Sequence, residues 1–120
     1  MATPSSEELR RAHSQLDRAL GEHKTDIVRD ATIQRFEFCI ELAWKTAKRH
    51  MGTASTAPRV IVREMAQQGL IHDASLWLEF LEYRNLASHT YHEPIADKVY
   101  DIARQFLPEG QKLLAALEKL

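Results

Sequence analysis

The sequence lacks the features that mark secreted and membrane proteins. It has a single cysteine, Cys39, so no intrachain disulfide can form and a reducing compartment is expected. No apolar run approaches the roughly 20 residues that a membrane-spanning helix needs. The first residues contain neither the basic nor the apolar segment of a signal peptide. These absences together predict a cytoplasmic protein that does not bind membranes.

The chain also lacks an excess of either charge. Its 16 Lys and Arg residues nearly balance its 17 Asp and Glu residues, which leaves a formal net charge of −1. There is therefore no global positive field of the kind that draws a protein onto nucleic acid without sequence preference. Any RNA binding must depend on a local patch or on the assembly of several chains. The length of 120 residues predicts a single domain over residues 1–120.

Signals for β-strands are absent as well. No segment alternates apolar and polar residues convincingly, and no Asn-Gly or Asp-Gly pair is present to close a hairpin. Helical periodicity and caps predict helices from Ser5 or Ser6 to about Gly21, from Asp26 to Met51, from Pro58 to Gly69, from Asp73 to a break near residues 92–94, and from Ile95 to the end. The predicted fold class is all-α, an antiparallel up-and-down bundle of four to five helices.

Proline and glycine are scarce, with four of each, so each one marks a position where helices start, end or bend. Pro58 fits the first turn of a helix, because its fixed φ and missing N–H cost nothing there. The residue before Pro94 is disfavoured in the α region, so the fourth helix should break in front of it. Pro108 and Gly110 should kink or split the last helix.

The helix expected over residues 26–51 is the predicted support of the bundle. Its apolar residues form one helical stripe that neighbouring apolar residues widen, so this helix should be contacted from two sides. The stripe comprises Ile33, Phe36, Ile40, Ala43, Trp44 and Ala47, and it is widened by Phe38, Cys39 and Leu42. Core packing is also the better interpretation of Trp77, and inward-facing positions are expected for Val60 and Leu86.

Side chains suited to chemistry gather at the end of the fourth helix. They are Arg84, Asn85, Ser88, His89 and Tyr91. A guanidinium suits phosphate because its planar fork donates two hydrogen bonds at once. An imidazole suits general acid–base catalysis near neutral pH. These parts suffice for metal-free cleavage of RNA, in which the ribose 2′-hydroxyl attacks the adjacent phosphate and Arg84 stabilises the developing charge.

The spacing of Arg84 and His89 raises a geometric problem. Five residues turn an ideal α-helix by about 500°, so the two side chains point roughly 140° apart. They cannot lie side by side on one straight helix. Either the helix loosens after Leu86, or the working pair is assembled across a two-fold axis from two chains.

Structural roles compete with the catalytic interpretation. Arg84 can pair at the surface with a carboxylate such as Glu93, and Tyr91 can simply cover the end of the bundle. The spacing of His89, His92 and Glu93 also permits a metal site, although the break at the following proline argues against it.

Two further polar groups lie on the helix over residues 26–51. A basic cluster at its end fits solvated charges that complement the helix dipole, with support of RNA or transferase binding as the functional alternative. This cluster comprises Lys45, Lys48, Arg49 and His50. Glu37 and Glu41 are four residues apart, and we expect Glu41 to bond Lys45 rather than to form an acid–base pair.

The motif at the end of the fourth helix resembles the Arg-Xaa4-His-Xaa-Tyr motif of HEPN-domain proteins (higher eukaryotes and prokaryotes nucleotide-binding). The matching residues are Arg84-Asn85-Leu86-Ala87-Ser88-His89-Thr90-Tyr91. Three other segments resemble the branch of that family called nucleotidyltransferase substrate-binding proteins. They are Thr32-Ile33-Gln34-Arg35-Phe36-Glu37, Glu41-Leu42-Ala43-Trp44-Lys45 and Pro58-Arg59-Val60-Ile61-Val62-Arg63-Glu64. The resemblance covers the chain from about residue 26 to the last helix.

The resemblance implies a helical bundle that forms a homodimer in which the Arg and His of both chains meet, and in many members a metal-independent endoribonuclease. It also implies a minimal nucleotidyltransferase as partner. In the toxin–antitoxin version of the pair, the HEPN protein is the toxin, and the transferase silences it by attaching AMP to the motif tyrosine, here Tyr91. This chain is not the transferase, because it lacks the Gly-Ser pair and the Asp-Xaa-Asp metal site of such enzymes.

Three functions therefore remain open from the sequence. The first is an RNA-cleaving toxin with Arg84 and His89 as catalytic residues, Asn85 and Ser88 in support, and neither metal nor cofactor. The second is a non-catalytic substrate-binding or acceptor subunit of the transferase. The third is a structural helical dimer with no chemistry at the motif.

Overall fold

The computed structural model describes residues 6–120, and most of them are helical. The elements in chain order are α1 (Glu7–Gly21), α2 (Asp26–Met51), α3 (Pro58–Gln67), α4 (Ala74–Leu86), the 3₁₀ turn η1 (Ala87–His89) and α5 (Glu93–Glu118). No β-strand occurs in this part of the chain. The predicted all-α helical fold is therefore confirmed. None of these helices combines the length and the apolar character needed to cross a membrane.

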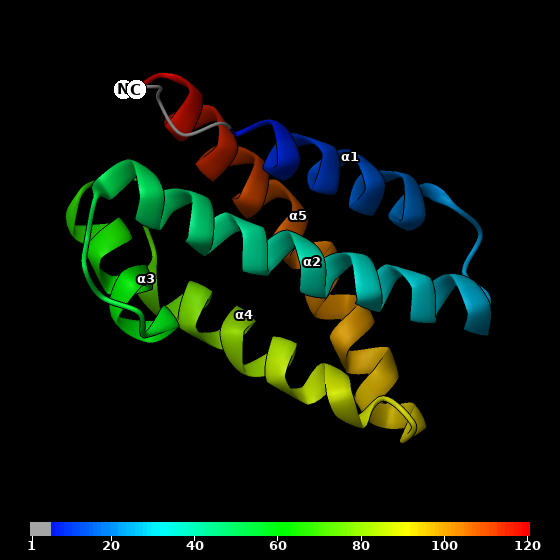
Figure 1. Cartoon of the computed structure of the whole chain (residues 1–120). Helices are drawn as coiled ribbons and strands as arrows, with labels where there is room; N and C mark the ends of the chain where they lie inside the picture. The colour runs from blue at the N-terminus through cyan, green and yellow to red at the C-terminus, as the bar shows by residue number, and fades with distance from the viewer. Residues whose placement is uncertain (1–5) are drawn as a thin grey trace.

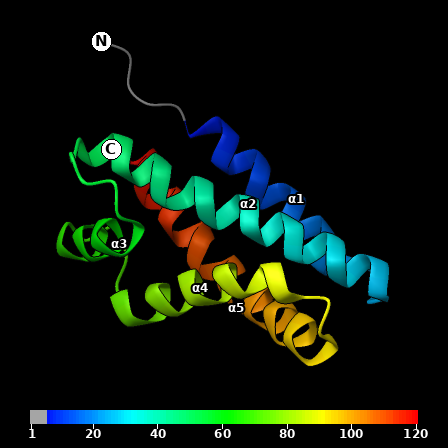
Figure 2. The ribbon, with the colours of Figure 1, turned by 60° about the horizontal axis from the view of Figure 1, so that its bottom comes forward.

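Helix α2 lies at the centre of the bundle (Figure 1). Helix α1 runs antiparallel along one side of it, α4 lies along another side, and α5 crosses behind. The short helix α3 packs against α4 and α2 at one end. The turn between α4 and α5 lies at the opposite end, as Figure 2 shows from a second direction. The turn that carries His89 and Tyr91 therefore lies at the end of the bundle remote from α3.

Capping residues explain why α2 and α4 begin and end where they do. The Thr25 side chain accepts a hydrogen bond from the Val28 N–H at 3.1 Å, which satisfies a free amide of the first turn of α2. Gly52 ends α2 in the left-handed region, at φ 70°, where a residue without Cβ is favoured. Asp73 caps α4 in the same way as Thr25 caps α2. Ser6 occupies the cap position of α1, whereas the alternative cap, Ser5, lies outside the described residues.

The predicted break of the chain in front of Pro94 is confirmed, whereas the predicted start of the last helix at Ile95 and its splitting at Pro108 are not observed. Helix α5 begins at Glu93, so the residue before Pro94 is already helical. Pro94 is accepted there because the amides of a first turn have no partner within the helix. The same helix continues through Pro108 to Glu118 and is not split. Buried residues before and after Pro108 pack on the rest of the bundle, which offsets the loss of one backbone hydrogen bond.

The core is built around the aromatic ring of Phe106 in α5. The rings of Phe36, Trp77 and Phe80 meet it edge to face, with centroids 5.3 to 5.5 Å away. His13 of α1 stacks on the same ring. The core roles predicted for Trp44, Trp77 and Cys39 are confirmed, since all three are buried.

Three predicted inward positions are wrong. Phe38 is 51% exposed, and Val60 and Leu86 are also exposed. The bundle covers α2 on the faces toward α1, α4 and α5, and Phe38 projects from the strip that remains. The ten-residue helix α3 buries a single stripe of Ile61, Val62 and Met65, which leaves Val60 outside it.

Candidate functional site

The α-helical part of α4 ends at Leu86, shortly before the motif histidine. The chain then tightens into η1, and the buried Ala87 anchors this turn to the bundle. The Ser88 hydroxyl donates a hydrogen bond to the Asn85 carbonyl at 3.1 Å, and the Thr90 hydroxyl donates to the Ala87 carbonyl at 3.2 Å. These bonds satisfy carbonyls that the ended helix leaves free. The helix does loosen after Leu86, as the first of the two solutions requires, but this loosening does not bring Arg84 and His89 into contact.

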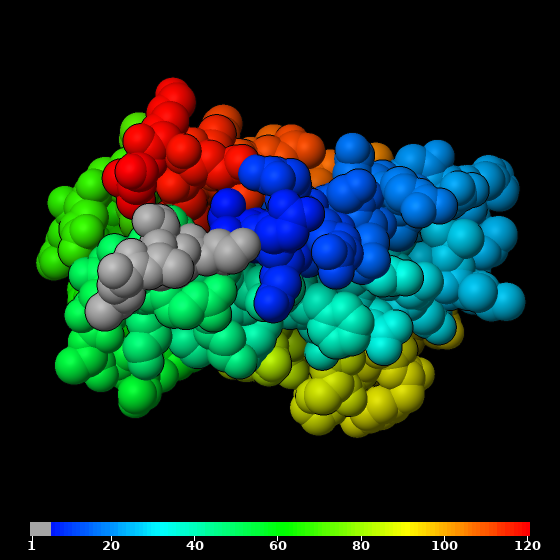
Figure 3. All heavy atoms as spheres, turned by 45° about the horizontal axis from the view of Figure 1, so that its top comes forward, coloured from blue at the N-terminus to red at the C-terminus, as the bar shows by residue number. Residues whose placement is uncertain are grey.

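His89 and Tyr91 come together on the turn that follows. Nδ1 of His89 lies 3.3 Å from the Tyr91 hydroxyl, and the two rings meet edge to face with centroids 5.9 Å apart. Both side chains are exposed, Tyr91 to 83%. In Figure 3 the yellow segment that includes this turn stands out as a lobe below α2. The contact orients the imidazole through Nδ1, and Nε2 takes no part in it.

Arg84 is held by α2 rather than by the turn. Its Nε lies 3.3 Å from Oε2 of Glu41, an ion pair whose angle is too poor for a hydrogen bond. Burial raises the pKa of Glu37, and the charge of Arg84 acts in the opposite direction. Within residues 6–120 the two terminal nitrogens of Arg84 have no hydrogen-bond partner. The outer fork of this guanidinium is therefore free to bind an anion.

Glu93 is not the partner of Arg84, contrary to the surface pairing considered from the sequence. It pairs with Arg29, whose side chain is only 5% exposed and whose Nη1 lies 2.5 Å from the Glu93 carboxylate. Arg29 also contacts Asp97 at 3.3 Å and Asp30 at 3.1 Å, and its hydrogen bond to Glu93 is the main reason why its pKa is raised. Because Arg29 ties the start of α5 to α2, the turn that carries His89 is anchored at both ends.

Sequence reasoning missed Arg29, although a signal for it was present. Arg29 lies four residues before Ile33 and seven before Phe36, so it is in register with the buried stripe of α2. A cation on an otherwise apolar face is buried only when it is paired. That register could have predicted an internal ion pair before the structure was known.

The structure does not bring all predicted site residues into contact. Among the described residues, no hydrogen bond or ring contact joins Arg84 to His89 or Tyr91. His92 caps α5, because its carbonyl accepts from the amides of the first turn. With Glu93 bonded to Arg29, these residues do not gather as the alternative metal site requires, and no other group of three possible ligands was found in residues 6–120.

A cleft of about 280 Å³ opens beside Arg84, between α2, α3 and α4. Its walls are Trp44, Pro58 and Leu81, and polar groups come from Glu41, Arg59, Arg84 and Asn85. The Glu41 carboxylate also lies 3.4 Å from the Trp44 indole nitrogen and 3.5 Å from Nζ of Lys45. The predicted Glu41–Lys45 pair is thus confirmed, but Glu41 holds Arg84 as well.

Comparison with known proteins identifies the family of this chain. A family model described as "nucleotidyltransferase substrate binding protein like" matches residues 5–119. The chain belongs to this family. The match confirms the resemblance predicted from the motif and its companion segments.

Relatives of the chain agree with this assignment. It is similar to a curated Haemophilus influenzae protein named probable ribonuclease HepT, at 34% identity over 115 residues that cover 86% of this chain and 79% of the relative. Its fold is similar to that of a Haemophilus influenzae protein described as a substrate-binding domain of a nucleotidyltransferase, with TM-score 0.83, 29% identity and coverage of 95% and 99%. It is also similar to the crystal structure of a Thermus thermophilus protein, with TM-score 0.83, 28% identity and coverage of 91% and 98%.

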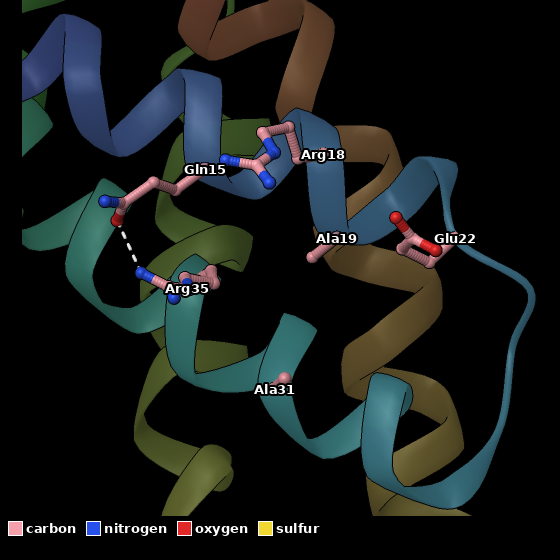
Figure 4. Close-up of a pocket in the computed structure, with 6 residues that line it drawn as sticks. All are labelled: Gln15, Arg18, Ala19, Glu22, Ala31 and Arg35. Atoms are coloured by element: carbon pink, nitrogen blue, oxygen red, sulfur yellow. Dashed lines mark hydrogen bonds between the residues drawn. The ribbon is translucent and has the colours of Figure 1, made fainter.

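This member of the nucleotidyltransferase substrate-binding family has another cleft between α1 and α2 (Figure 4). It measures about 230 Å³ and is lined by Gln15, Arg18, Ala19, Glu22, Ala31 and Arg35. Arg35 crosses it and donates a hydrogen bond to the Gln15 side chain at 2.5 Å. None of its lining residues belongs to the motif, so it serves below as the internal comparison for the cleft beside Arg84.

Proposed function

We propose that this chain is the HEPN partner of a minimal nucleotidyltransferase and that it cleaves RNA without a metal ion. The observation that carries the proposal is that the last turn of α4 and the turn after it present a free Arg84 fork and an exposed, oriented His89. The family assignment and the relative named probable ribonuclease HepT support it. The transferase partner is proposed from the relative described as a substrate-binding domain of a nucleotidyltransferase.

The proposed reaction uses the substrate's own nucleophile. His89 takes the proton from the ribose 2′-hydroxyl, the 2′-oxygen bonds to phosphorus, and the bond from phosphorus to the 5′-oxygen breaks. The departing 5′-oxygen receives a proton from an imidazolium, and the products are a 2′,3′-cyclic phosphate and a 5′-hydroxyl end. Arg84 donates two hydrogen bonds to the phosphate oxygens, where negative charge increases in the transition state.

A homodimer completes this site in the proposal. Within the described chain Arg84 pairs with α2 and His89 contacts Tyr91, so neither side chain reaches the other. A two-fold axis near the end of α4 brings the His89 and Arg84 side chains of a second chain next to those of the first. The two imidazoles then supply both the base and the acid. The exposed Leu86 between the two motif residues gives that interface an apolar contact.

Silencing is proposed to occur at Tyr91. Its side chain is exposed, and its hydroxyl lies 3.3 Å from the His89 imidazole. When the transferase joins AMP to this oxygen, the phenol can no longer donate to Nδ1, and a bulky anion occupies the place of the RNA phosphate. The HEPN protein is then the toxin of the pair, and the transferase restrains it in the cytoplasm.

A second candidate is a non-catalytic acceptor subunit. The exposure of Tyr91 favours it, because an 83% exposed phenol can enter the active site of another protein without local unfolding. Under this candidate the transferase still modifies Tyr91, but the unmodified chain does not cut RNA. The two candidates therefore differ in one measurable activity.

Cleavage of labelled RNA by the purified chain, with EDTA present, tests the nuclease. Arg84→Ala and His89→Ala should each reduce the rate by roughly 10²- to 10⁴-fold. The controls Arg63→Ala and His72→Ala remove the same residue types from exposed positions outside the motif and should cut normally. Wild-type protein that leaves RNA intact, or cutting that survives both motif variants, refutes the nuclease.

Intact mass after incubation with ATP, Mg²⁺ and the transferase tests the acceptor role. We expect the mass of adenylate to appear on the wild type and on the control Tyr83→Phe, but not on Tyr91→Phe. Adenylate on the acceptor without any RNA cleavage by the unmodified chain selects the second candidate. Unchanged labelling of Tyr91→Phe rejects Tyr91 as the acceptor under either candidate.

A further inference from the structure

The cleft beside Arg84 has a composition that packing of the bundle does not require. Its apolar lining residues come from three helices, and Glu41, Arg59, Arg84 and Asn85 add polar groups. We propose that this cleft seats one nucleobase of single-stranded RNA, namely a base that carries an amino group, and that Glu41 reads that amino group. The inference rests on the proposed function, because the phosphate attached to this nucleotide is the one that Arg84 holds.

The size and walls of the cleft favour a base over a larger ligand. Its volume of about 280 Å³ is just below the range of roughly 300 to 1,000 Å³ found for sites of drug-sized ligands. Trp44 and Leu81 come from α2 and α4, and because they are only 8% and 7% exposed each offers the cleft a small apolar surface, to which Pro58 of α3 adds. Single-stranded RNA is recognised by bases that splay out onto such aromatic and apolar surfaces.

The position of Arg84 links this cleft to the scissile phosphate. Its Nε is turned toward Glu41 inside the cleft, while its terminal nitrogens have no partner within residues 6–120. A phosphate bound by that fork therefore lies at the rim of the cleft. The base of the same nucleotide then has the apolar walls within reach.

Glu41 determines which base fits. Contacts of 3.3 Å to Arg84, 3.4 Å to Trp44 and 3.5 Å to Lys45 hold its carboxylate in place. The side chain is still 30% exposed, so part of it faces an incoming ligand. An ionised carboxylate only accepts hydrogen bonds, which favours adenine, cytosine or guanine with their amino groups. Uracil places carbonyl oxygens on both sides of its one ring N–H and is disfavoured.

Arg59 is a second cation that lines the cleft. Its only ion pair among the described residues is with Glu82 at 3.8 Å, and both side chains are more than half exposed. Such a pair contributes little, so Arg59 can release it and stack on the face of the base or bind a neighbouring phosphate. Replacement of Arg59 by an acidic residue should weaken RNA binding without a change in the packing of the hydrophobic core.

Fluorescence anisotropy with short labelled 2′-fluoro oligomers of A, C and U tests the inference. These oligomers lack the attacking hydroxyl, so the assay needs no catalysis. We expect the A and C oligomers to bind about tenfold more tightly than the U oligomer, the discrimination of one hydrogen-bonded base contact. Glu41→Gln should remove most of this preference, since an amide both donates and accepts, whereas the control Glu82→Gln should keep it.

A charge-reversal pair locates the bound RNA. Arg59→Glu should weaken binding about tenfold, whereas Arg18→Glu, the same change in the cleft of Figure 4, should have a much smaller effect. Both residues are exposed, so folding is preserved and circular dichroism can verify it. Equal affinity for the U oligomer, equal effects of the two reversals, or no binding at all overturns the base site.

The outcomes for the two proposals are separable. Base-selective binding by a chain that does not cut RNA supports this inference and rejects the nuclease. Cutting that is unaffected by Arg59→Glu and Glu41→Gln, together with unselective binding, supports the nuclease and rejects this inference.

Discussion

Protonation of His13 should destabilise the folded chain below neutral pH by an amount that follows from its surroundings. The ring is 4% exposed, and neither of its nitrogens has a hydrogen-bond partner within residues 6–120. Burial lowers the pKa of His13 from 6.5 to about 4. The unfolded chain therefore binds a proton between these two values that the folded chain does not, and stability falls as the pH drops through this window.

The magnitude can be worked out from the two pKa values. While the unfolded state is protonated and the folded state is neutral, each drop of one pH unit removes about 1.4 kcal/mol of unfolding free energy. Between pH 7 and pH 5 the loss amounts to about 2 kcal/mol, and it approaches about 3 kcal/mol near pH 4. Glu93 and Asp97, which bond Arg29, become protonated only at lower pH, because Arg29 holds the pKa values of both carboxyls below their usual range.

Urea unfolding at pH 7 and pH 5, followed by circular dichroism, measures this loss. His13→Leu removes the titrating group, so the difference between the two pH values should shrink by about 2 kcal/mol relative to the wild type. His23→Leu removes an exposed histidine and should retain the wild-type difference. A His13→Leu protein with unchanged pH dependence would show that His13 is solvated in solution, and the reasoning would fail.

Two further predictions concern the packing that supports the site. Gly110→Ala places a Cβ 2.2 Å from Cε1 of the buried His13 ring, so we expect a loss of about 1 to 3 kcal/mol in urea unfolding, whereas Gly21→Ala, which meets nothing within 4 Å, should not destabilise. Equal effects of the two would contradict the close approach of α1 and α5. Arg29→Met should unfold at lower urea concentration than the wild type at pH 7. The difference in unfolding free energy between the two proteins should narrow below about pH 4.5, because Arg29, which lowers the pKa of Glu93, stabilises only the ionised carboxylate. A deficit that is constant with pH would argue against the ion cluster.

Rules based on neighbouring residues predicted most helix limits, but they did not predict that α5 includes both Pro94 and Pro108. The limits of α2 follow from the Thr25 cap and Gly52, which are properties of neighbouring residues. Pro108 breaks the local rule because the helix around it is fixed by packing on α1, α2 and α4. The inward position predicted for Phe38 was wrong for a similar reason. A helical stripe shows which residues share a face, but not how much of that face the neighbouring helices cover.

The motif could be read from the sequence, but its surroundings could not. Arg84, His89 and Tyr91 lie within eight positions, and a pattern of that length is visible in the chain. Glu41 lies far from Arg84 in sequence and reaches it only because α2 and α4 pack side by side in one register. No spacing rule predicts that register. The free fork and the cleft depend on it, whereas the tie through Arg29 depends on the packing of α2 against α5.

The contact between Glu41 and Arg84 fits a role in orientation better than one in inhibition. A carboxylate beside a phosphate-binding guanidinium lowers its attraction for anions, but a partly exposed ion pair contributes only about 0.2 to 1 kcal/mol. Each hydrogen bond to a charged group contributes roughly 1.5 to 3 kcal/mol, and a phosphate can accept two from the free fork. By these magnitudes, the phosphate that we propose to bind at the fork is attracted more strongly than the ion pair opposes it, and Glu41 need not be displaced. What Glu41 fixes is the direction of the fork, which points outward because Nε is held on the inner side.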